Sequence, residues 1–163
     1  MPKEIERKFL LKNDSWRGQA VSHRLLRQGY AGFAQDPRLT LRIRQTGHQA
    51  FLTLKGPSAG CSRSEFEYQI PSEDAAAILK EFCGSGLVEK KRWRVPCGVH
   101  VWEVDEFLGD NAGLVVAEIE LDSPDAPFEI PDWLGREVTG EVRFYNARLA
   151  DCPYCKWTED ERK

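Results

Sequence analysis

Charged side chains recur at every second position in successive stretches of this chain, and neighbouring charges within a stretch usually have the same sign. Side chains two residues apart on a β-strand share a face and lie roughly 6.6 Å apart along it. Two carboxylates at that distance repel by roughly 2 kcal/mol at an effective dielectric constant near 20. A fold that repeats such pairs is expected to bind something between them. The positions are Glu4 and Glu6 before Lys8, Arg42 and Arg44, Lys55, Glu65 and Glu67, Lys90 and Arg92, Glu103 and Asp105, and Glu118 and Glu120.

Apolar side chains occupy the alternate positions of the same stretches. Leu41 and Ile43, for example, alternate with Arg42 and Arg44, and this period of two predicts β-strands with one charged and one apolar face. A further strand is expected in HRLLRQGYAG. Turn sequences such as QTGHQ, PCGVH and LGDNAG separate the stretches and favour hairpins, so the sheet should be largely antiparallel.

Three helices are expected between and after these strands. The segment PSEDAAAILKEFCGSG predicts a helix with Ser72 as its N-cap and with Leu79 and Phe82 in its apolar stripe. A short helix is expected within residues 125–135, although prolines limit its length. Another is expected over residues 139–150.

The charged face could belong either to an open sheet that faces water or to the inside of a closed barrel. A solvated face usually mixes charges of both signs, since like charges across strands are unfavourable. Here the signs are grouped, and the pattern extends over at least seven stretches. Closure also removes the exposed edges of a long sheet. We therefore predict an α+β, mainly β fold: a closed eight-stranded antiparallel β-barrel, or tunnel, with a polar charged interior and a few helices on the outside.

Composition sets the wider limits. The 163 residues, 41% hydrophobic and 30% charged, predict one domain over residues 1–163. The net charge of −3 gives no general attraction to nucleic acid or to a membrane surface. Two early glutamates and the absence of a long apolar run predict a cytoplasmic protein. Cys152 and Cys155 form a C-x-x-C, but no second pair completes a zinc site.

The residues expected inside the barrel indicate the class of ligand. Carboxylate oxygens suit hard divalent cations, so Mg²⁺ or Mn²⁺ is expected, whereas the three histidines fall outside the charged pattern. Arginine and lysine side chains on several strands could surround an anion with phosphate-like oxygens. A linear triphosphate with one or two metal ions would satisfy both sets. No glycine-rich phosphate loop is present, so side chains would have to hold the phosphates.

The chain resembles the CYTH superfamily of triphosphate tunnel metalloenzymes. EIERKF resembles the E-x-E-x-K signature of the family, and LRIRQ, TLKG, the E-F-E strand, VEKKRW, WEVDEF and AEIEL follow in the family's order over nearly the whole chain. The resemblance implies an eight-stranded tunnel that acts on triphosphate compounds with Mg²⁺ or Mn²⁺. The last motif departs from the usual T-x-D-x-R-Y-x-N, since Glu141 replaces the acid and Phe144 the tyrosine.

The resemblance also implies roles for individual residues. The implied metal ligands are Glu4, Glu6 and Glu120, with Glu65 in an acidic group that positions a second metal ion or the attacking water. The implied substrate-binding residues are Lys8, Arg42, Arg44, Lys55, Lys90 and Arg92, with Arg143 as a further member. The implied catalytic carboxylates are Glu67, Asp105 and Glu118, and the sequence does not choose among them for orienting the water.

Hydrolysis of inorganic tripolyphosphate to diphosphate and phosphate is the expected reaction, because the compact chain resembles short bacterial triphosphatases. A class IV adenylate cyclase, or a triphosphatase acting on thiamine triphosphate or a nucleotide, would use the same tunnel. A protein of a different class, which binds polyphosphate or nucleotide without cutting it, would need the same cations. The expected partner is thus a small triphosphate, with no nucleic acid and no membrane.

Overall fold

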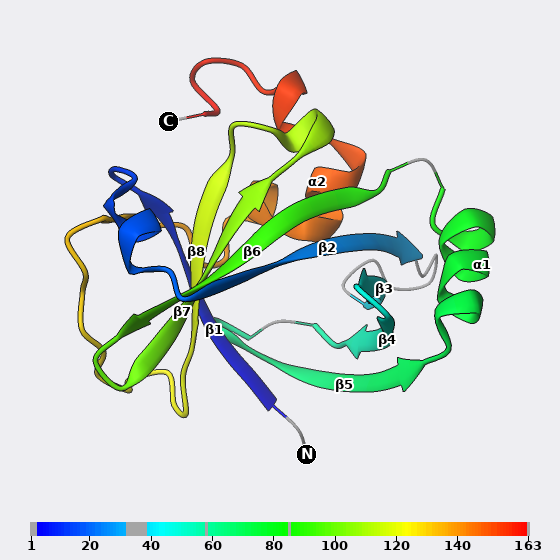
Figure 1. Ribbon diagram of the computed structural model, residues 1–163, viewed down its shortest axis with the longest axis horizontal. Helices are drawn as coiled ribbons and strands as arrows, with labels where there is room; N and C mark the ends of the chain where they lie inside the picture. Colours follow the sequence, from blue (N-terminus) through cyan, green and yellow to red (C-terminus); the bar gives the residue numbers. More distant parts are fainter. Residues whose placement is uncertain (1–2, 32–38, 58, 85, 163) are drawn as a thin grey trace.

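A computed structural model describes residues 3–31, 39–57, 59–84 and 86–162. This part of the chain contains a sheet of nine strands and two α-helices (Figure 1). The strands are β1 (Lys3–Leu11), β2 (Ser22–Ala31), β3 (Thr40–Thr46), β4 (Gln49–Lys55), β5 (Ser62–Ile70), β6 (Val88–Cys97), β7 (His100–Phe107), β8 (Val115–Glu120) and β9 (Leu134–Glu137).

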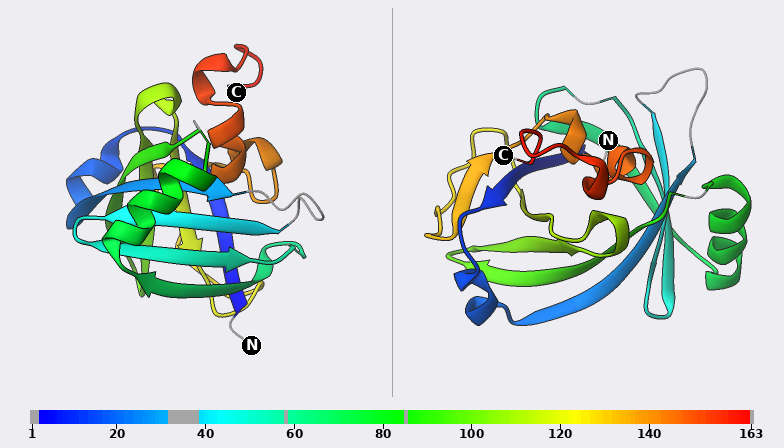
Figure 2. Two further views of the ribbon diagram at one scale, coloured as in Figure 1. Left: turned by 90° about the vertical axis from the view of Figure 1, so that its right-hand side faces the viewer. Right: turned by 90° about the horizontal axis from the view of Figure 1, so that it is seen from above.

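Eight of these strands close into an antiparallel barrel. They follow one another in the order β5-β4-β3-β2-β6-β7-β8-β1, and β1 closes the ring by pairing with β5. The residues Lys3–Ile5 of β1 pair with β5, while Phe9 and Leu11 at its other end pair with β9. The predicted fold class is confirmed, with β9 as an additional strand. Figure 2 shows the enclosed ring from two further directions.

The helix α1 (Ser72–Phe82) covers the outer face of β2, β3 and β4. Ala75 and Leu79 are buried against Ile43 and neighbouring apolar residues of these strands. The close approach depends on Gly29, where an added Cβ would lie 2.7 Å from the Leu79 side chain. The predicted helix is confirmed, but two details were wrong. Phe82 is 66% exposed, and Ser72 begins the helix instead of capping it.

The outer face of β1, β6, β7 and β8 packs against a loop and a short 3₁₀ helix, η1 (Ser15–Gln19). Trp102 and Trp133 meet edge to face here, with ring centroids 5.6 Å apart. The helix predicted within residues 125–135 is not formed. Pro127 and Pro131 lack the backbone N–H that a helix needs, and the segment runs without regular structure into β9.

The C-terminal segment lies on the side of the barrel opposite to the start of β1 (Figure 1). It forms η3 (Val142–Phe144), α2 (Asn146–Asp151) and η4 (Tyr154–Lys156). The helix predicted over 139–150 therefore begins later. Gly140 has a φ of 80°, a left-handed backbone conformation that interrupts helical structure.

One end of the barrel interior is apolar. Phe144, Leu149 and Trp157 of the C-terminal segment pack there against Val88, Phe107 and Val116, which come from the inner faces of β6, β7 and β8. The charged residues of the same inner faces begin one layer further along the strands. Among the described residues, no helix is long and apolar enough to cross a membrane.

Candidate active site

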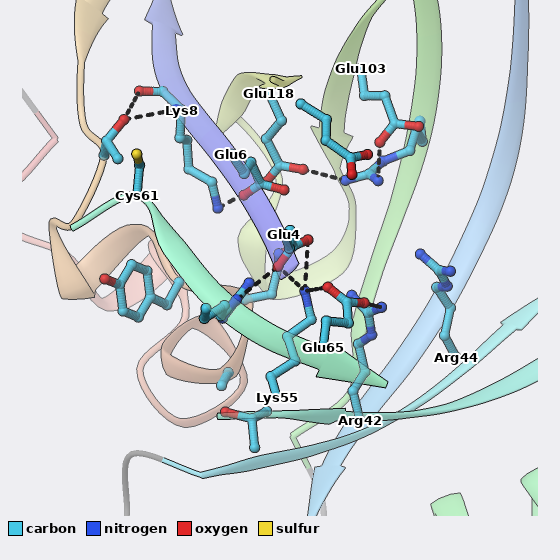
Figure 3. Close-up of a pocket in the computed structure, with 18 of the residues that line it drawn as sticks. Glu4, Glu6, Lys8, Arg42, Arg44, Lys55, Cys61, Glu65, Glu103 and Glu118 are labelled. Carbon is cyan, nitrogen blue, oxygen red and sulfur yellow. Dashed lines mark hydrogen bonds and ion pairs between the residues drawn. The ribbon is translucent and has the colours of Figure 1, made fainter. Parts of the chain in front are cut away.

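The barrel encloses a cavity of about 690 Å³ whose walls are mostly charged (Figure 3). This volume lies in the range usual for small-molecule sites. The side chains reach it because strand alternation sends every second residue inward. The sequence-predicted site residues that line it are Glu4, Glu6, Lys8, Arg42, Arg44, Lys55, Glu65, Glu67, Arg92, Glu118 and Glu120.

Glu4 is the centre of one group of ion pairs. One of its carboxylate oxygens lies 2.9 Å from Lys55 Nζ and 2.8 Å from Arg63 Nε. The same lysine also lies 2.9 Å from Glu65. Burial alone would raise the pKa of Glu4. The charge of Lys55, a hydrogen bond from Glu65 and the charge of Arg63 outweigh burial and lower the pKa to about 2. Burial and the nearby Glu4 raise the pKa of Glu65. Glu4 is therefore firmly ionised, whereas Glu65 takes up a proton more readily.

Glu118 is the centre of a second group and is almost fully buried. Lys8 Nζ lies 2.8 Å from one of its carboxylate oxygens, and the Arg92 guanidinium donates to the other at 2.5 Å. Lys8 also donates to the backbone carbonyl of Phe144 at 3.3 Å. Burial opposes ionisation of Glu118, yet Lys8 and Arg92 hold its pKa well below the ordinary value. Through these contacts, Glu118 on β8 joins Lys8 on β1 to Arg92 on β6.

A third group joins β3 to β5. Arg42 and Arg44 both donate to the Glu67 carboxylate, at 3.1 and 3.0 Å, and Thr53 donates to it at 2.9 Å. Burial would raise the pKa of Glu67, but Arg44, Thr53 and Arg42 lower it. The Nε atoms of Arg42 and Arg44 are buried without a hydrogen-bond partner in the described part of the chain. Each guanidinium thus has donor capacity left for a further acceptor.

Three sequence-predicted site residues do not line the cavity. Lys90 and Asp105 are 2% and 0% exposed and form an ion pair with each other. Asp105 also accepts two hydrogen bonds from Arg92, both at 2.7 Å, a bidentate arrangement that fixes the guanidinium plane. Arg143 lies outside, where it pairs with Glu141 at 3.1 Å and donates to the Glu161 carbonyl.

Two cavity carboxylates have no cationic partner among the described residues. Glu6 and Glu120 face each other in the register of β1 and β8, and neither carboxylate forms an ion pair or a hydrogen bond in the described ranges. Burial and the charge of Glu118 raise the pKa of Glu6 to about 7. Burial, Glu4 and Glu103 also raise the pKa of Glu120. Such a pair has unsatisfied negative charge when ionised, which a cation would stabilise.

The pair itself offers carboxylate oxygens, the kind of ligand that the hard cations Mg²⁺ and Mn²⁺ prefer. Within the described ranges, no cluster of three or more His, Cys, Asp or Glu side chains is already arranged to hold a metal ion. Glu4 is held instead by Lys55 and Arg63. The donor chemistry thus fits a divalent cation, with Glu4, Glu6 and Glu120 as the carboxylates that could hold it.

Several cavity residues were not assigned to the site from the sequence. Arg63 follows the alternation of Glu65 and Glu67 on β5, and Glu103 belongs to the charged pattern but had no role. Arg24 and Arg94 also line the cavity. Their spacing from Gln28 and from Arg92 places them on inward-facing positions, so the period of two could have identified them. Thr139, Tyr145 and Asn146 contribute from the C-terminal segment, and no strand pattern marks them.

Comparison with known proteins gives consistent results. The model of the CYTH domain family matches residues 2–145. An inorganic triphosphatase of Acetivibrio thermocellus is 45% identical over 159 residues, which cover 98% of this chain and 100% of that protein. One from Nitrosomonas europaea is 39% identical over 152 residues, covering 90% and 96%. A crystal structure of an inorganic triphosphatase has 34% identity and a TM-score of 0.64, covering 92% of this chain and 95% of that one.

Proposed function

The chain belongs to the CYTH domain family, and we propose that it hydrolyses inorganic tripolyphosphate to diphosphate and phosphate. One observation carries the proposal: a closed barrel gathers cations and unpaired carboxylates around one cavity. Two relatives that align with nearly the whole chain bear the name inorganic triphosphatase. A highly charged anion with its metal ion would use both halves of this lining.

Lysine and arginine side chains of four strands would hold the phosphates. Lys8, Arg42, Arg44, Lys55 and Arg92 come from β1, β3, β4 and β6 and line the cavity. Arginine can bind phosphate oxygens in a bidentate manner, while lysine supplies a compact charge. These donors would stabilise the charge that spreads over the transferred phosphoryl group.

Lys90 and Asp105 would act indirectly. Because Asp105 receives two hydrogen bonds from Arg92 and an ion pair from Lys90, it would fix the direction in which Arg92 meets the phosphates. We therefore treat Asp105 as a positioning residue. Arg143, which points away from the cavity, has no part in this scheme.

Glu4, Glu6 and Glu120 would hold a Mg²⁺ or Mn²⁺ ion, with Glu65 nearby for a second. When bound, such an ion neutralises phosphate charge and lowers the pKa of a coordinated water. The unpaired state of Glu6 and Glu120 supports this assignment. Their raised pKa values reflect the same unfavourable concentration of negative charge that a cation relieves.

Binding would exchange the partners of the ion pairs. Glu4 and Glu118 each contact lysine or arginine side chains that would also bind the phosphates in this scheme. Removing only one partner of a buried pair is costly. Metal and tripolyphosphate together replace both partners at once: Glu4 gains the metal, Glu118 gains the attacking water, and the lysines and arginines gain phosphate oxygens. We expect metal and substrate to bind cooperatively for this reason.

The reaction itself is a single displacement. The oxygen of a water attacks the terminal phosphorus, the bond from that phosphorus to the bridging oxygen breaks, and diphosphate leaves with the electron pair. Glu67 or Glu118 would orient the water and accept its proton, because both carboxylates line the cavity whereas Asp105 does not. In-line geometry and charge stabilisation supply most of the catalysis in such reactions.

A substrate panel tests the proposal. Tripolyphosphate, ATP and thiamine triphosphate are incubated with Mg²⁺ or Mn²⁺, and phosphate, diphosphate and cyclic AMP are all measured. We expect tripolyphosphate to have the highest kcat/KM and to yield diphosphate and phosphate. Cyclic AMP as the main product from ATP would overturn the proposal. Tight binding of tripolyphosphate without metal-dependent turnover would instead identify a binding protein.

A further inference from the structure

Two arginines in the cavity wall take no part in the proposed reaction. Arg24 on β2 and Arg94 on β6 line the cavity and are exposed at its edge. Neither side chain forms an ion pair or a hydrogen bond within the part of the chain that the structure describes. The other cations of the lining each contact at least one carboxylate: Lys8, Arg42, Arg44, Lys55, Arg63 and Arg92.

The strand register explains why these two side chains have no ion-pair partner among the described residues. Arg24 stands opposite Arg92 in the pairing of β2 with β6, so its cross-strand neighbour has the same charge. Arg94 stands opposite Glu103 in the pairing of β6 with β7, but the Glu103 carboxylate contacts Arg92 instead. Like charges at facing positions of a sheet are destabilising. The arrangement would be stabilised by an anion.

The two arginines extend the cationic wall outward from the substrate-binding group. Along the inner face of β6, exposure rises from Lys90 through Arg92, at 2% and 8%, to the exposed Arg94. The step from Arg92 to Arg94 is about 6.6 Å along the strand. Burial, Arg42, Arg92 and Arg24 all lower the pKa of Arg44. Arg24 therefore lies near Arg44, a member of the group that would hold the triphosphate.

We propose that Arg24 and Arg94 form an outer anion subsite for the phosphate that follows the third in a linear polyphosphate. This inference rests on the proposed function of the cavity. A chain whose inner phosphates meet Arg44 and Arg92 would continue toward the open edge, where its next negative charge meets two unpaired guanidinium groups. A neutral organic group at this position would leave both positive charges uncompensated. The subsite therefore favours a longer polyphosphate over a triphosphate that carries an organic group.

The test compares tripolyphosphate with tetrapolyphosphate. Binding of each is measured by titration calorimetry in EDTA, so that turnover does not interfere, for the wild type and the double variant Arg24→Gln/Arg94→Gln. The matched control is Arg27→Gln/Lys91→Gln, which removes the same charge from outward-facing positions of the same strands. Unfolding curves confirm that all three proteins are folded.

We expect the wild type to bind tetrapolyphosphate at least about tenfold more tightly than tripolyphosphate, as one charge-assisted contact would give. The double variant should lose this preference while its affinity for tripolyphosphate changes less than about twofold. An equal loss for both anions, or a similar loss in the control, would overturn the subsite. A selective loss in a protein that hydrolyses neither compound would support the subsite and refute the proposed function.

Discussion

The charged middle of the barrel and its apolar end are built from the same faces of the same strands. Toward the apolar end, the next residue on the same face is Leu10 after Lys8, Val88 after Lys90, Phe107 after Asp105 and Val116 after Glu118. At the apolar end, Phe144, Leu149 and Trp157 of the C-terminal segment fill the interior. One layer away, ion pairs surround a cavity.

The direction in which a strand residue points and its chemical type are therefore separate properties. The period of two fixes which side chains point inward, whereas the identity of each inward residue decides whether that layer packs or binds. The layer of Lys90 and Asp105 is the boundary, because it is charged yet as buried as the apolar layer beside it. Changes at this boundary and on either side of it should therefore have very different effects.

The largest effect is expected at the boundary itself. Asp105→Asn would leave Lys90 and Arg92 with an uncompensated buried charge, and we expect it to lower the free energy of unfolding by about 3–5 kcal/mol. Urea unfolding followed by tryptophan fluorescence measures this loss. The double variant Lys90→Met/Asp105→Leu extends the apolar end by one layer and should recover most of the stability. A loss below about 1 kcal/mol in Asp105→Asn would show that the boundary layer does not depend on the pair.

In the charged middle, we expect a clear loss of activity without a loss of stability. Glu120 is exposed and forms no ion pair within the described ranges, so Glu120→Gln should leave the unfolding curve unchanged. We expect it to lower kcat/KM for tripolyphosphate by about a hundredfold, or roughly 2.7 kcal/mol, through loss of a metal ligand. Glu81→Gln, at an exposed position of α1, is the matched control. Full activity of the Glu120 variant would remove Glu120 from the metal site.

The pH dependence of metal binding should sharpen the same contrast. Burial and Glu118 raise the pKa of Glu6 to about 7, and only the ionised carboxylate binds a metal ion. The apparent affinity for Mn²⁺ in the presence of tripolyphosphate should therefore fall about tenfold for each pH unit below 7. Glu6→Gln should bind Mn²⁺ weakly at every pH. An affinity that stays constant between pH 6 and 8 in the wild type would contradict this role.

The same shift has a consequence for stability. Because the pKa of Glu6 is higher in the folded chain than its ordinary value of 4.5, the folded state binds the proton more tightly. The contribution of Glu6 to stability is thus present at low pH and is lost as the pH rises from 4.5 through 7. Mn²⁺ with tripolyphosphate should restore the lost stability at pH 8, as a higher unfolding temperature would show.

The smallest effect is expected on the outside of the apolar end. Cys155 is exposed at the C-terminal segment, in contrast to the packed Trp157. We expect Cys155→Ser to change the free energy of unfolding by less than about 0.5 kcal/mol and to leave phosphate release unchanged. A clear loss of either would mean that the C-x-x-C has a function beyond its place in this segment.

Much of the barrel could be predicted because its strands alternate so regularly. The inward positions of Glu4, Arg42, Lys55 and Glu118 all follow from that period. The segment before β9 was mistaken for a helix because its apolar residues suggested one, whereas its prolines prevent it. The apolar end could not be foreseen, since it forms only when the C-terminal segment meets strands that are distant in sequence.

The site was predicted in outline but not in its depth. Alternation places Asp105 and Lys90 inward just as it places Arg92, and only the packing shows that they lie behind it. Arg24 and Arg94, whose side chains have no partner among the described residues, were not predicted because each stands in a stretch where other residues carry the family motif. Partner choice within a group of charges depends on three-dimensional register, which a period of two does not reveal.

A crystal structure with Mn²⁺ and tripolyphosphate would show directly whether the charged cavity binds both and exchanges its ion pairs. We expect an anomalous Mn²⁺ peak beside Glu6 and Glu120, with phosphates bound by Arg42, Arg44 and Arg92. We also expect Lys55 to have left Glu4 for a phosphate oxygen. Metal or phosphates bound outside the barrel, with the pairs around Glu4 and Glu118 intact, would contradict it.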